Sequence, residues 1–113
     1  MDPNPLYEVV GDVSYRVVKH GGGLANRVYE IGVTIAPAHR GKGYGAEAQR
    51  LLAAYLFATY PIARVQATTD ITNIGEQRAL ERAGFTREGV LRQAQFRAGS
   101  WHDMVMYSKL RGE

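Results

Sequence analysis

The 113-residue chain contains no cysteine, which excludes disulfides, thiolate metal ligands and a cysteine nucleophile. It also lacks any apolar run near the ~20 residues that a membrane-spanning helix needs. Its three histidines, His20, His39 and His102, show no metal-ligand spacing, so no metal is expected. These absences predict a cytoplasmic protein that has no membrane partner.

Blocks of like charge are absent too. The net charge of +3 permits an anionic ligand, but the 14 lysines and arginines are scattered singly, so no nucleic acid partner is expected. With 45% hydrophobic residues, the chain has the composition of an ordinary globular protein. We expect a single domain over residues 1–113, which is long enough to bury a core without covalent staples.

The pattern of apolar residues predicts a mixed α/β fold. Residues rich in β-branched and aromatic side chains predict strands, and helical spacing after residue 45 predicts an amphipathic helix that ends near Pro61. The expected order is β-β-β-α-β-α-β-β, a mostly antiparallel sheet with one crossover. The expected segments are one or two strands over 6–20 with a break at Gly11-Asp12, a strand over 28–37, a strand over 62–70, a helix over 73–83 and a terminal hairpin.

Turn and capping residues mark the ends of the later elements. Asn73 is a good N-cap, and Glu76 stands at the capping-box position. Gly84 suits the left-handed residue that follows a helix, with Phe85 as its hydrophobic contact. The hairpin is expected to turn around Ala98-Gly99-Ser100.

The stretch "HRGKGYG", residues 39–45, lies between a predicted strand and a predicted helix. Free backbone N–H groups and the helix dipole favour an anion at such a place. Glycines let the backbone approach a phosphate closely, since a Cβ would collide with it. The loop therefore predicts a bound diphosphate, and the alternative is a glycine-rich turn that only joins the two elements.

Two known phosphate-binding patterns resemble this stretch in part. The Walker pattern fails, because Gly45 is followed by Ala46 and Glu47 instead of Lys and Ser or Thr. The dinucleotide fingerprint G-x-G-x-x-[GA] matches Gly41, Gly43 and Ala46 and stays open as an alternative. Against it, four residues separate the strand from the first glycine, and no further βαβ unit follows.

Nucleophilic catalysis by serine is not expected. "HGGG" at 20–23 is a candidate oxyanion loop, yet the chain has no G-x-S-x-G motif. Ser100, His102 and Asp103 follow one another too closely along one strand to form a triad.

Taken together, the motifs resemble the GNAT superfamily of acyl-CoA N-acyltransferases, from about Val9 to Lys109. Arg40 to Gly45 matches that family's R-x-x-G-x-G loop. The segment from Asn73 to Phe85, then "REGVLR" and "WHDMVMYSKL", is similar to the ribosomal-protein alanine N-acetyltransferase branch. The resemblance implies a GNAT-like fold and acetyl-CoA as co-substrate. The implied CoA-binding residues are Val33, Thr34, Ile35, Arg40, Gly41, Lys42, Gly43, Tyr44, Gly45, Ala46, Asn73 and Arg78.

The resemblance also implies a reaction, the direct attack of a neutral amine on the acetyl thioester. Glu30 stands where many relatives carry a glutamate base, and its alternative is a solvated strand glutamate. Leu80 occupies the position of the family's acid tyrosine, and Glu76 occupies that of a serine common in the similar branch. Tyr107 is a candidate substitute for the acid, or else a core residue.

Family members usually place a strand and two helices before the region matched here. We therefore expect an N-terminally shortened member of the family with an exposed sheet edge, which forms a homodimer through residues 6–19. The expected acceptor is the amine of a protein N-terminus, a polyamine, an antibiotic or another small molecule. The alternative function is a catalytically weak acyl-CoA-binding or sensor domain.

Overall fold

The structure is a computed structural model that describes residues 10–23 and 26–113. Its elements alternate along the chain in the order β-β-α-β-α-β-β, with a short 3₁₀ turn before the first helix. Their bounds are β1 Gly11–Lys19, β2 Arg27–Ile35, η2 Pro37–His39, α1 Tyr44–Thr59, β3 Arg64–Asp70, α2 Ile74–Arg82, β4 Thr86–Arg97 and β5 Ser100–Leu110.

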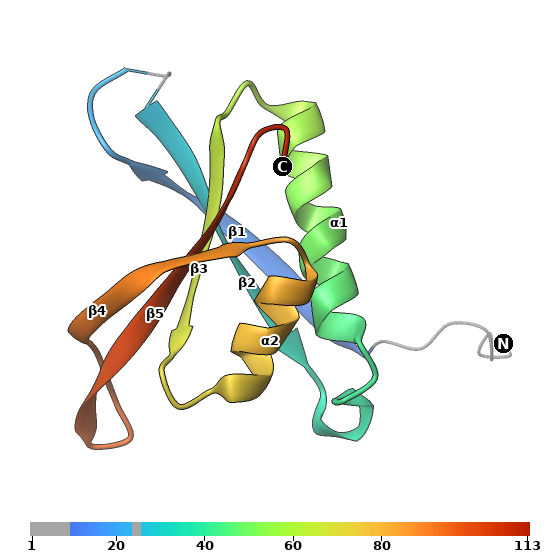
Figure 1. Cartoon of the computed structure of the whole chain (residues 1–113), viewed down its shortest axis with the longest axis vertical. Helices are drawn as coiled ribbons and strands as arrows, with labels where there is room; N and C mark the ends of the chain where they lie inside the picture. The colour runs from blue at the N-terminus through green and yellow to red at the C-terminus, as the bar shows by residue number, and fades with distance from the viewer. Residues whose placement is uncertain (1–9, 24–25) are drawn as a thin grey trace, which may run out of the picture.

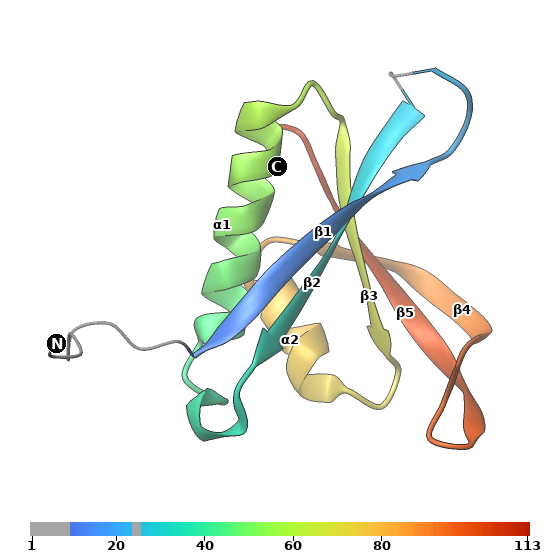
Figure 2. The same ribbon diagram turned by 180° about the vertical axis from the view of Figure 1, so that it is seen from behind.

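The five strands form one sheet in the order β1-β2-β3-β5-β4. Only β2 and β3 run parallel, and the other three neighbouring pairs are antiparallel. This confirms the expected mixed, mostly antiparallel sheet. Both helices lie on one face of the sheet (Figure 1), and no described element covers the opposite face, which Figure 2 presents to the viewer.

The hydrophobic core lies between the helices and the sheet. Leu56 of α1 and Leu80 of α2 are fully buried against Val65 of β3 and Val105 of β5. These residues follow the helical and strand periods from which the elements were predicted. The core therefore fixes how α2 lies beside α1 on the sheet.

The expected helix ends are largely confirmed. The Asn73 side chain accepts a hydrogen bond from the Glu76 N–H over 3.1 Å. Gly84 has φ +92°, and the Phe85 N–H donates to the Leu80 carbonyl over 2.9 Å, as a left-handed helix ending requires. The reciprocal half of the capping box was wrong, because the Asn73 N–H donates to the Asp70 carbonyl instead and the Glu76 side chain turns away.

The β4–β5 hairpin turns at Ala98 and Gly99, with φ of 53° and 83°. Two consecutive positive φ angles are typical of the two-residue turn that matches the twist of paired strands. The predicted turn position is confirmed.

The N-terminal region differs from the expectation in one respect. Gly11–Lys19 forms a single strand, which is one of the two outcomes expected for residues 6–20, and it begins at the expected Gly11-Asp12 break; residues 6–9 lie outside the described chain. Gly11 begins β1 and pairs with Ile35 at the far end of β2. In place of the three strands expected before the first helix, the described residues contain two.

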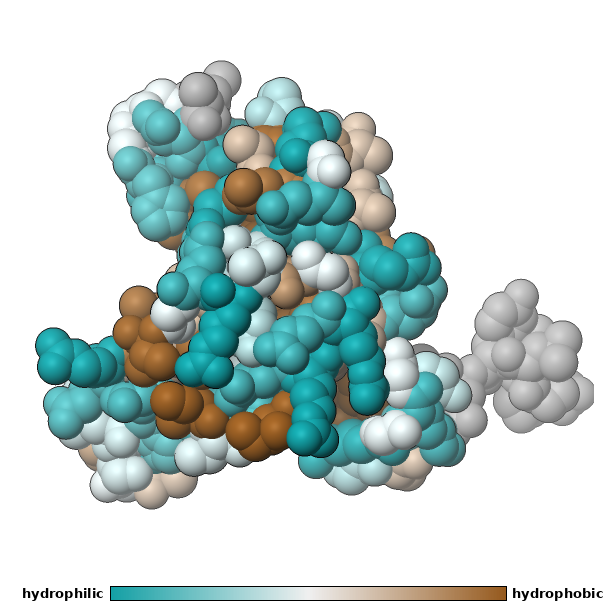
Figure 3. Space-filling view, in the orientation of Figure 1, coloured by the Kyte–Doolittle hydropathy of each residue, from teal (hydrophilic) through white to brown (hydrophobic). Residues whose placement is uncertain are grey.

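Large apolar side chains remain exposed in three regions, one of which is α1, with Tyr44, Leu51 and Tyr55. On β1, Val13, Tyr15 and Val17 are 44%, 42% and 43% exposed, at alternate positions that share one face of this edge strand. A third group belongs to β4, β5 and the residues around the start of α2, where Figure 3 shows hydrophobic atoms at the lower left of an otherwise mostly hydrophilic surface. Among the described residues, no helix is both long and apolar enough to cross a membrane.

Candidate active site

The parallel strands β2 and β3 part soon after they meet. Their register contains two pairs, Tyr29 with Val65 and Glu30 with Gln66. Beyond these pairs β2 continues to Ile35 and β3 to Asp70 without pairing to each other. The edge of β2 from Ile31 onward therefore faces an opening in the sheet instead of a neighbouring strand.

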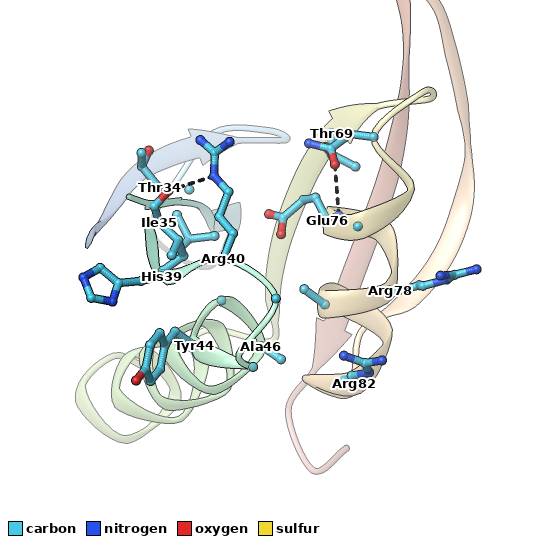
Figure 4. Close-up of a pocket in the computed structure, with 18 of the residues that line it drawn as sticks. Thr34, Ile35, His39, Arg40, Tyr44, Ala46, Thr69, Glu76, Arg78 and Arg82 are labelled. Atoms are coloured by element: carbon cyan, nitrogen blue, oxygen red, sulfur yellow. Dashed lines mark hydrogen bonds between the residues drawn. The ribbon is translucent and has the colours of Figure 1, made fainter. Parts of the chain in front are cut away.

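A cavity of about 730 Å³ fills this opening. Its walls are the edge of β2, the glycine loop with the first turn of α1, the end of β3, and one side of α2 (Figure 4). The structure brings together eleven of the twelve residues expected to bind CoA, namely Val33, Thr34, Ile35, Arg40, Gly41, Gly43, Tyr44, Gly45, Ala46, Asn73 and Arg78. Lys42 belongs to the same loop but does not line the cavity.

The glycine loop is open on the side where a ligand would lie. Gly41 and Gly43 have φ of 76° and 84°, and a Cβ built on either would meet no protein atom within 4 Å. Gly43 is the N-cap of α1, and no side chain caps that helix end. Arg40 fastens the loop to β2, since its Nε donates to the Ile35 carbonyl over 3.1 Å. The first turn of α1 thus presents backbone N–H groups and the positive end of the helix dipole to an anion.

Arginine side chains supply further positive charge around the cavity. Arg78 and Arg82 of α2 line it together with Arg40 of the loop. Figure 4 shows the Arg78 side chain directed away from the glycine loop and Arg82 at the last turn of α2. Sequence reasoning missed Arg82, although its spacing of four residues from Arg78 places both on one side of a helix.

Glu76 also lines the cavity, and sequence reasoning assigned it to a helix cap only. Its carboxylate accepts a hydrogen bond from Gln49 Nε2 of α1 over 3.2 Å. Figure 4 shows the carboxylate directed from α2 into the space between Thr69 and Arg40. Burial raises the pKa of Glu76, and the hydrogen bond from Gln49 offsets only part of that effect.

Glu30 lies at the point where β2 and β3 part, next to the cavity residue Ile31 but not itself in the cavity wall. Its side chain is 16% exposed and forms an ion pair with Arg16 of β1 at 2.6 Å. Gln66 of β3 donates to its other oxygen over 2.8 Å. Burial alone would raise the pKa of Glu30, but the hydrogen bonds from Arg16 and Gln66 outweigh it and hold that pKa below its ordinary value.

The contacts of Glu30 continue as a polar row across the strands. Arg64 Nε donates to Gln66 over 3.0 Å, and its guanidinium binds both oxygens of Glu88 at 2.8 and 2.7 Å. Ser108 donates to Glu88 over 2.7 Å. With Arg16 and Glu30, this polar row joins all five strands.

Tyr107, the expected substitute acid, lies in the core. It is fully buried, its hydroxyl donates to Glu81 over 2.8 Å, and it does not line the cavity. Burial and the neighbouring Glu81 raise the pKa of its hydroxyl. Leu80, at the family's acid position, is fully buried as well.

His102 has a different carboxylate partner from the Asp103 considered in the sequence. Its Nδ1 pairs with Asp70 at the end of β3, while its Nε2 lies 3.2 Å from Ser100 Oγ and 3.0 Å from the Arg97 carbonyl oxygen. That carbonyl can only accept, so Nε2 carries a proton and is no base for Ser100. The geometry does not form a catalytic triad.

Comparison with known proteins agrees with this geometry. The family model described as an acetyltransferase (GNAT) domain matches residues 3–86. The chain belongs to the GNAT acetyltransferase family. It is 40% identical over 73 residues to the probable N-acetyltransferase YjcK of Bacillus subtilis (strain 168), a match that covers 65% of this chain and 40% of that protein.

Solved GNAT structures share the fold. The microcin C7 self-immunity acetyltransferase MccE, solved in complex with acetyl-CoA and AMP, is 29% identical to this chain and has a TM-score of 0.78. The match covers 91% of this chain and 55% of the MccE chain. The ribosomal-protein-S5-alanine acetyltransferase from Vibrio fischeri is 21% identical and has a TM-score of 0.82. The match covers 96% of this chain and 57% of that chain, and it shows that the two share a fold. The chain spans between 40% and 58% of the length of the curated relatives it matches.

Proposed function

We propose that the protein is an acetyl-CoA-dependent N-acetyltransferase that moves the acetyl group to a primary amine by direct attack. The observation that carries the proposal is the cavity between the parted strands β2 and β3, which has an open glycine loop and a helix N-terminus at one side. A diphosphate attached to a long, narrow arm fits this combination of an anion site and an exposed strand edge.

The residues in and beside the cavity suit the diphosphate and the pantetheine arm of acetyl-CoA. The amides of residues 41–46 would hold the diphosphate, since no Cβ fills the space in front of Gly41 and Gly43. The backbone of residues 33–35 would bind the pantetheine arm along the edge of β2. Asn73 would contact the same arm with the part of its amide that does not cap α2, and Arg78, with Lys42 of the loop, would meet the phosphates.

The chemistry requires little beyond alignment of the two reactants. Holding the amine and the thioester carbonyl in line supplies on the order of 7–11 kcal/mol in well-oriented systems. Glu30, which its hydrogen bonds keep ionised at neutral pH, would take the proton from the attacking nitrogen directly or through water. Because its pKa is lowered it is a weak base, and this suits an α-amine, which is already partly neutral at a pKa of about 7.7–8.0.

The acceptor is an amine, and two classes of acceptor remain as proposals. The similar structures include acetyltransferases named for ribosomal-protein alanine and for spermidine. We propose a protein N-terminus or a small amine, entering from the sheet face that no described helix covers. We place the reaction in the cytoplasm.

We also propose that the chain forms a homodimer through β1. The outer edge of β1 has no partner strand among the described residues, and Val13, Tyr15 and Val17 expose a shared apolar face beside it. An open strand edge with apolar side chains is a natural template for pairing with a second copy.

A second candidate function is an acyl-CoA-binding or sensor domain of weak activity. It is favoured by the burial of Leu80 and Tyr107 in the core, which keeps both from acting as the general acid that many family members use. Calorimetry with acetyl-CoA, followed by product analysis on a panel of amines, separates the two functions. Binding with turnover supports the acetyltransferase, binding without turnover supports the sensor, and absence of binding contradicts both.

A further inference from the structure

Glu76 is the carboxyl group that lines the cavity without an ion pair to any described residue. Gln49, which is 1% exposed, donates to the Gly45 carbonyl over 3.1 Å and to Glu76 Oε1 over 3.2 Å with the same nitrogen. Because the Gly45 carbonyl can only accept, the group of Gln49 that lies beside it must be the NH₂ group. The same NH₂ group faces Glu76, so Gln49 donates to the Glu76 carboxylate and does not accept from it. The second oxygen of Glu76, Oε2, forms no hydrogen bond with the described residues and is left to face the cavity.

Burial and the lack of a charged partner favour the neutral form of Glu76, although the first turn of α2, in which it lies, favours a negative charge. Thr68 and Thr69 of β3 carry no charge, and Arg40 across the cavity uses its Nε on the Ile35 carbonyl. Arg78 and Arg82 line the cavity farther along α2, and His39 and Tyr44 line it on the loop side. Among the described residues, Gln49 is the side chain that the Glu76 carboxylate contacts by a hydrogen bond. A carboxyl group that is partly buried with a single neutral donor holds its proton more tightly than one in water.

The position of Glu76 along the cavity agrees with a role near the thioester. Ala79 of α2 lies beside the glycine loop, since a Cβ on Gly45 would be 4.0 Å from the Ala79 Cβ. Glu76 lies one helical turn before Ala79, on the side of α2 that follows β3, and it lines the cavity together with Thr68 and Thr69 of that strand. A ligand whose diphosphate binds the loop directs its other end toward this side of the cavity.

We propose that Glu76 is the general acid of the reaction, and that its carboxyl group gives a proton to the sulfur of the departing CoA. This inference rests on the proposed acetyltransferase function. It assigns a proton donor to a site in which Leu80 and Tyr107 are both buried in the core.

The step balances as follows. The lone pair of the amine nitrogen forms the new bond to the carbonyl carbon, and the electron pair of the carbon–sulfur bond goes to sulfur. The proton on Glu76 moves to that sulfur, and the surplus proton on nitrogen goes to Glu30 or to water. Glu76 regains a proton from water once CoA has left. Because a thiol has a pKa near 8.5 and a glutamic acid is far more acidic, the transfer to sulfur is downhill.

The experiment compares two acetyl donors in the wild type and in Glu76→Gln, a variant that keeps the acceptor oxygen for Gln49. One donor is acetyl-CoA, and the other is an S-acetyl aryl thioester, whose acidic thiol leaves without a proton. Glu76→Gln should lower turnover with acetyl-CoA about 10²-fold, the low end of general-acid contributions. It should leave the rate with the aryl donor unchanged. The ratio of the two rates does not depend on how much of the variant is folded.

The matched control is Glu113→Gln, which removes an exposed carboxylate that contacts the Leu110 N–H. It should leave the ratio of the two rates at the wild-type value. A fall of equal size with both donors in Glu76→Gln, or no fall with either, would overturn the assignment of Glu76. A wild-type chain that binds acetyl-CoA but acetylates no amine would instead contradict the proposed function.

A measurement without turnover tests the same assignment. Carbon-13 NMR of glutamate side chains, with Glu76 identified by the signal missing from Glu76→Gln, should give a titration midpoint above the ordinary glutamate value. A midpoint at or below that value would contradict the inference, whatever the rates.

Discussion

Gln66 donates a hydrogen bond to Glu30 over 2.8 Å, at the last rung before β2 and β3 part. This hydrogen bond joins β2 to β3 beside the point where the two strands part and the cavity begins. It also holds the Glu30 carboxylate, together with Arg16, at the border between the cavity and the sheet face that no described helix covers. The proposed base is therefore fixed by the same contact that marks the end of the strand pairing.

Substitution of Glu30 tests this role. Glu30→Gln should lower turnover at neutral pH by about 10²-fold if Glu30 takes the amine proton, with little change in acetyl-CoA affinity. The loss should shrink as the pH approaches the pKa of the amine, because the neutral amine then needs no base. Steady-state rates across this pH range, with calorimetric affinities, measure both effects.

Glu88→Gln provides the control for Glu30→Gln. It removes another carboxylate of the polar row, one that pairs with Arg64 on the far side of Gln66. Its turnover should equal that of the wild type. Equal rates for Glu30→Gln and the wild type at every pH would leave Glu30 with a structural role.

The glycine loop gives a second test. Gly43→Val should abolish acetyl-CoA binding, because the side chain would fill the space in front of the loop amides. Strain at φ 84° should cost roughly 1–3 kcal/mol, which a small domain tolerates. Calorimetry on the folded variant measures the affinity.

Gly99→Val is matched to this variant in backbone geometry. Gly99 has φ +83° and open space around it, but it lies in the β4–β5 turn. It should show a similar loss of thermal stability and unchanged acetyl-CoA affinity. If both variants bound acetyl-CoA as the wild type does, the loop would not be the diphosphate site.

Acid should destabilise the fold through two carboxylates. Hydrogen bonds from Thr72, aided by Arg97 and His102, lower the pKa of Asp70 to about 2 against the cost of burial, and Arg64 and Ser108 do the same for Glu88. A group with a lowered folded pKa stabilises the fold above its unfolded pKa and loses that contribution as the pH falls through the folded value.

The free energy of unfolding should therefore be steady above about pH 5 and fall between about pH 4 and 2. Asp70→Asn should be less stable than the wild type at pH 7, and the difference should narrow toward pH 2. Urea melts at several pH values measure this. A difference between the two proteins that stayed constant down to pH 2 would contradict the assigned direction.

Self-association is the fourth test. The apolar face of β1 amounts to a few hundred Å² at most, worth several kcal/mol at ~25 cal/mol per Å² if a second copy covers it. The wild type should sediment as a dimer at micromolar concentration, and Val17→Lys as a monomer. Phe96→Lys, which changes a 60% exposed side chain at the hairpin, should remain dimeric. A wild type that sediments as a monomer at this concentration would contradict the proposed homodimer.

The two helices, the strands from β2 onward and the terminal hairpin were predictable from local signals, whereas the binding residues of the cavity were implied by the resemblance to the family. The turns at Asn73, Gly84 and Gly99 were predictable because the backbone angles there favour few residue types. The glycine loop was predictable for the same reason, since Gly41 and Gly43 have positive φ.

Side-chain directions that depend on distant partners were not predictable. Glu76 matches a capping box in sequence, yet Gln49, 27 residues away, determines where its carboxylate points. The sequence offered Asp103, the neighbour of His102 in the chain, as its carboxylate partner, whereas in the structure His102 pairs with Asp70 of another strand. Tyr107 was a candidate acid until burial and Glu81 placed its hydroxyl in the core.

The most direct test of the central claim uses acetyl-CoA labelled in its acetyl group. The wild-type protein is incubated with a panel of peptide N-termini, polyamines and small amines, and the products are analysed by mass spectrometry. The account predicts label on the nitrogen of at least one amine, with none formed by Gly43→Val. Tight binding of acetyl-CoA with no labelled amine from any member of the panel would contradict it.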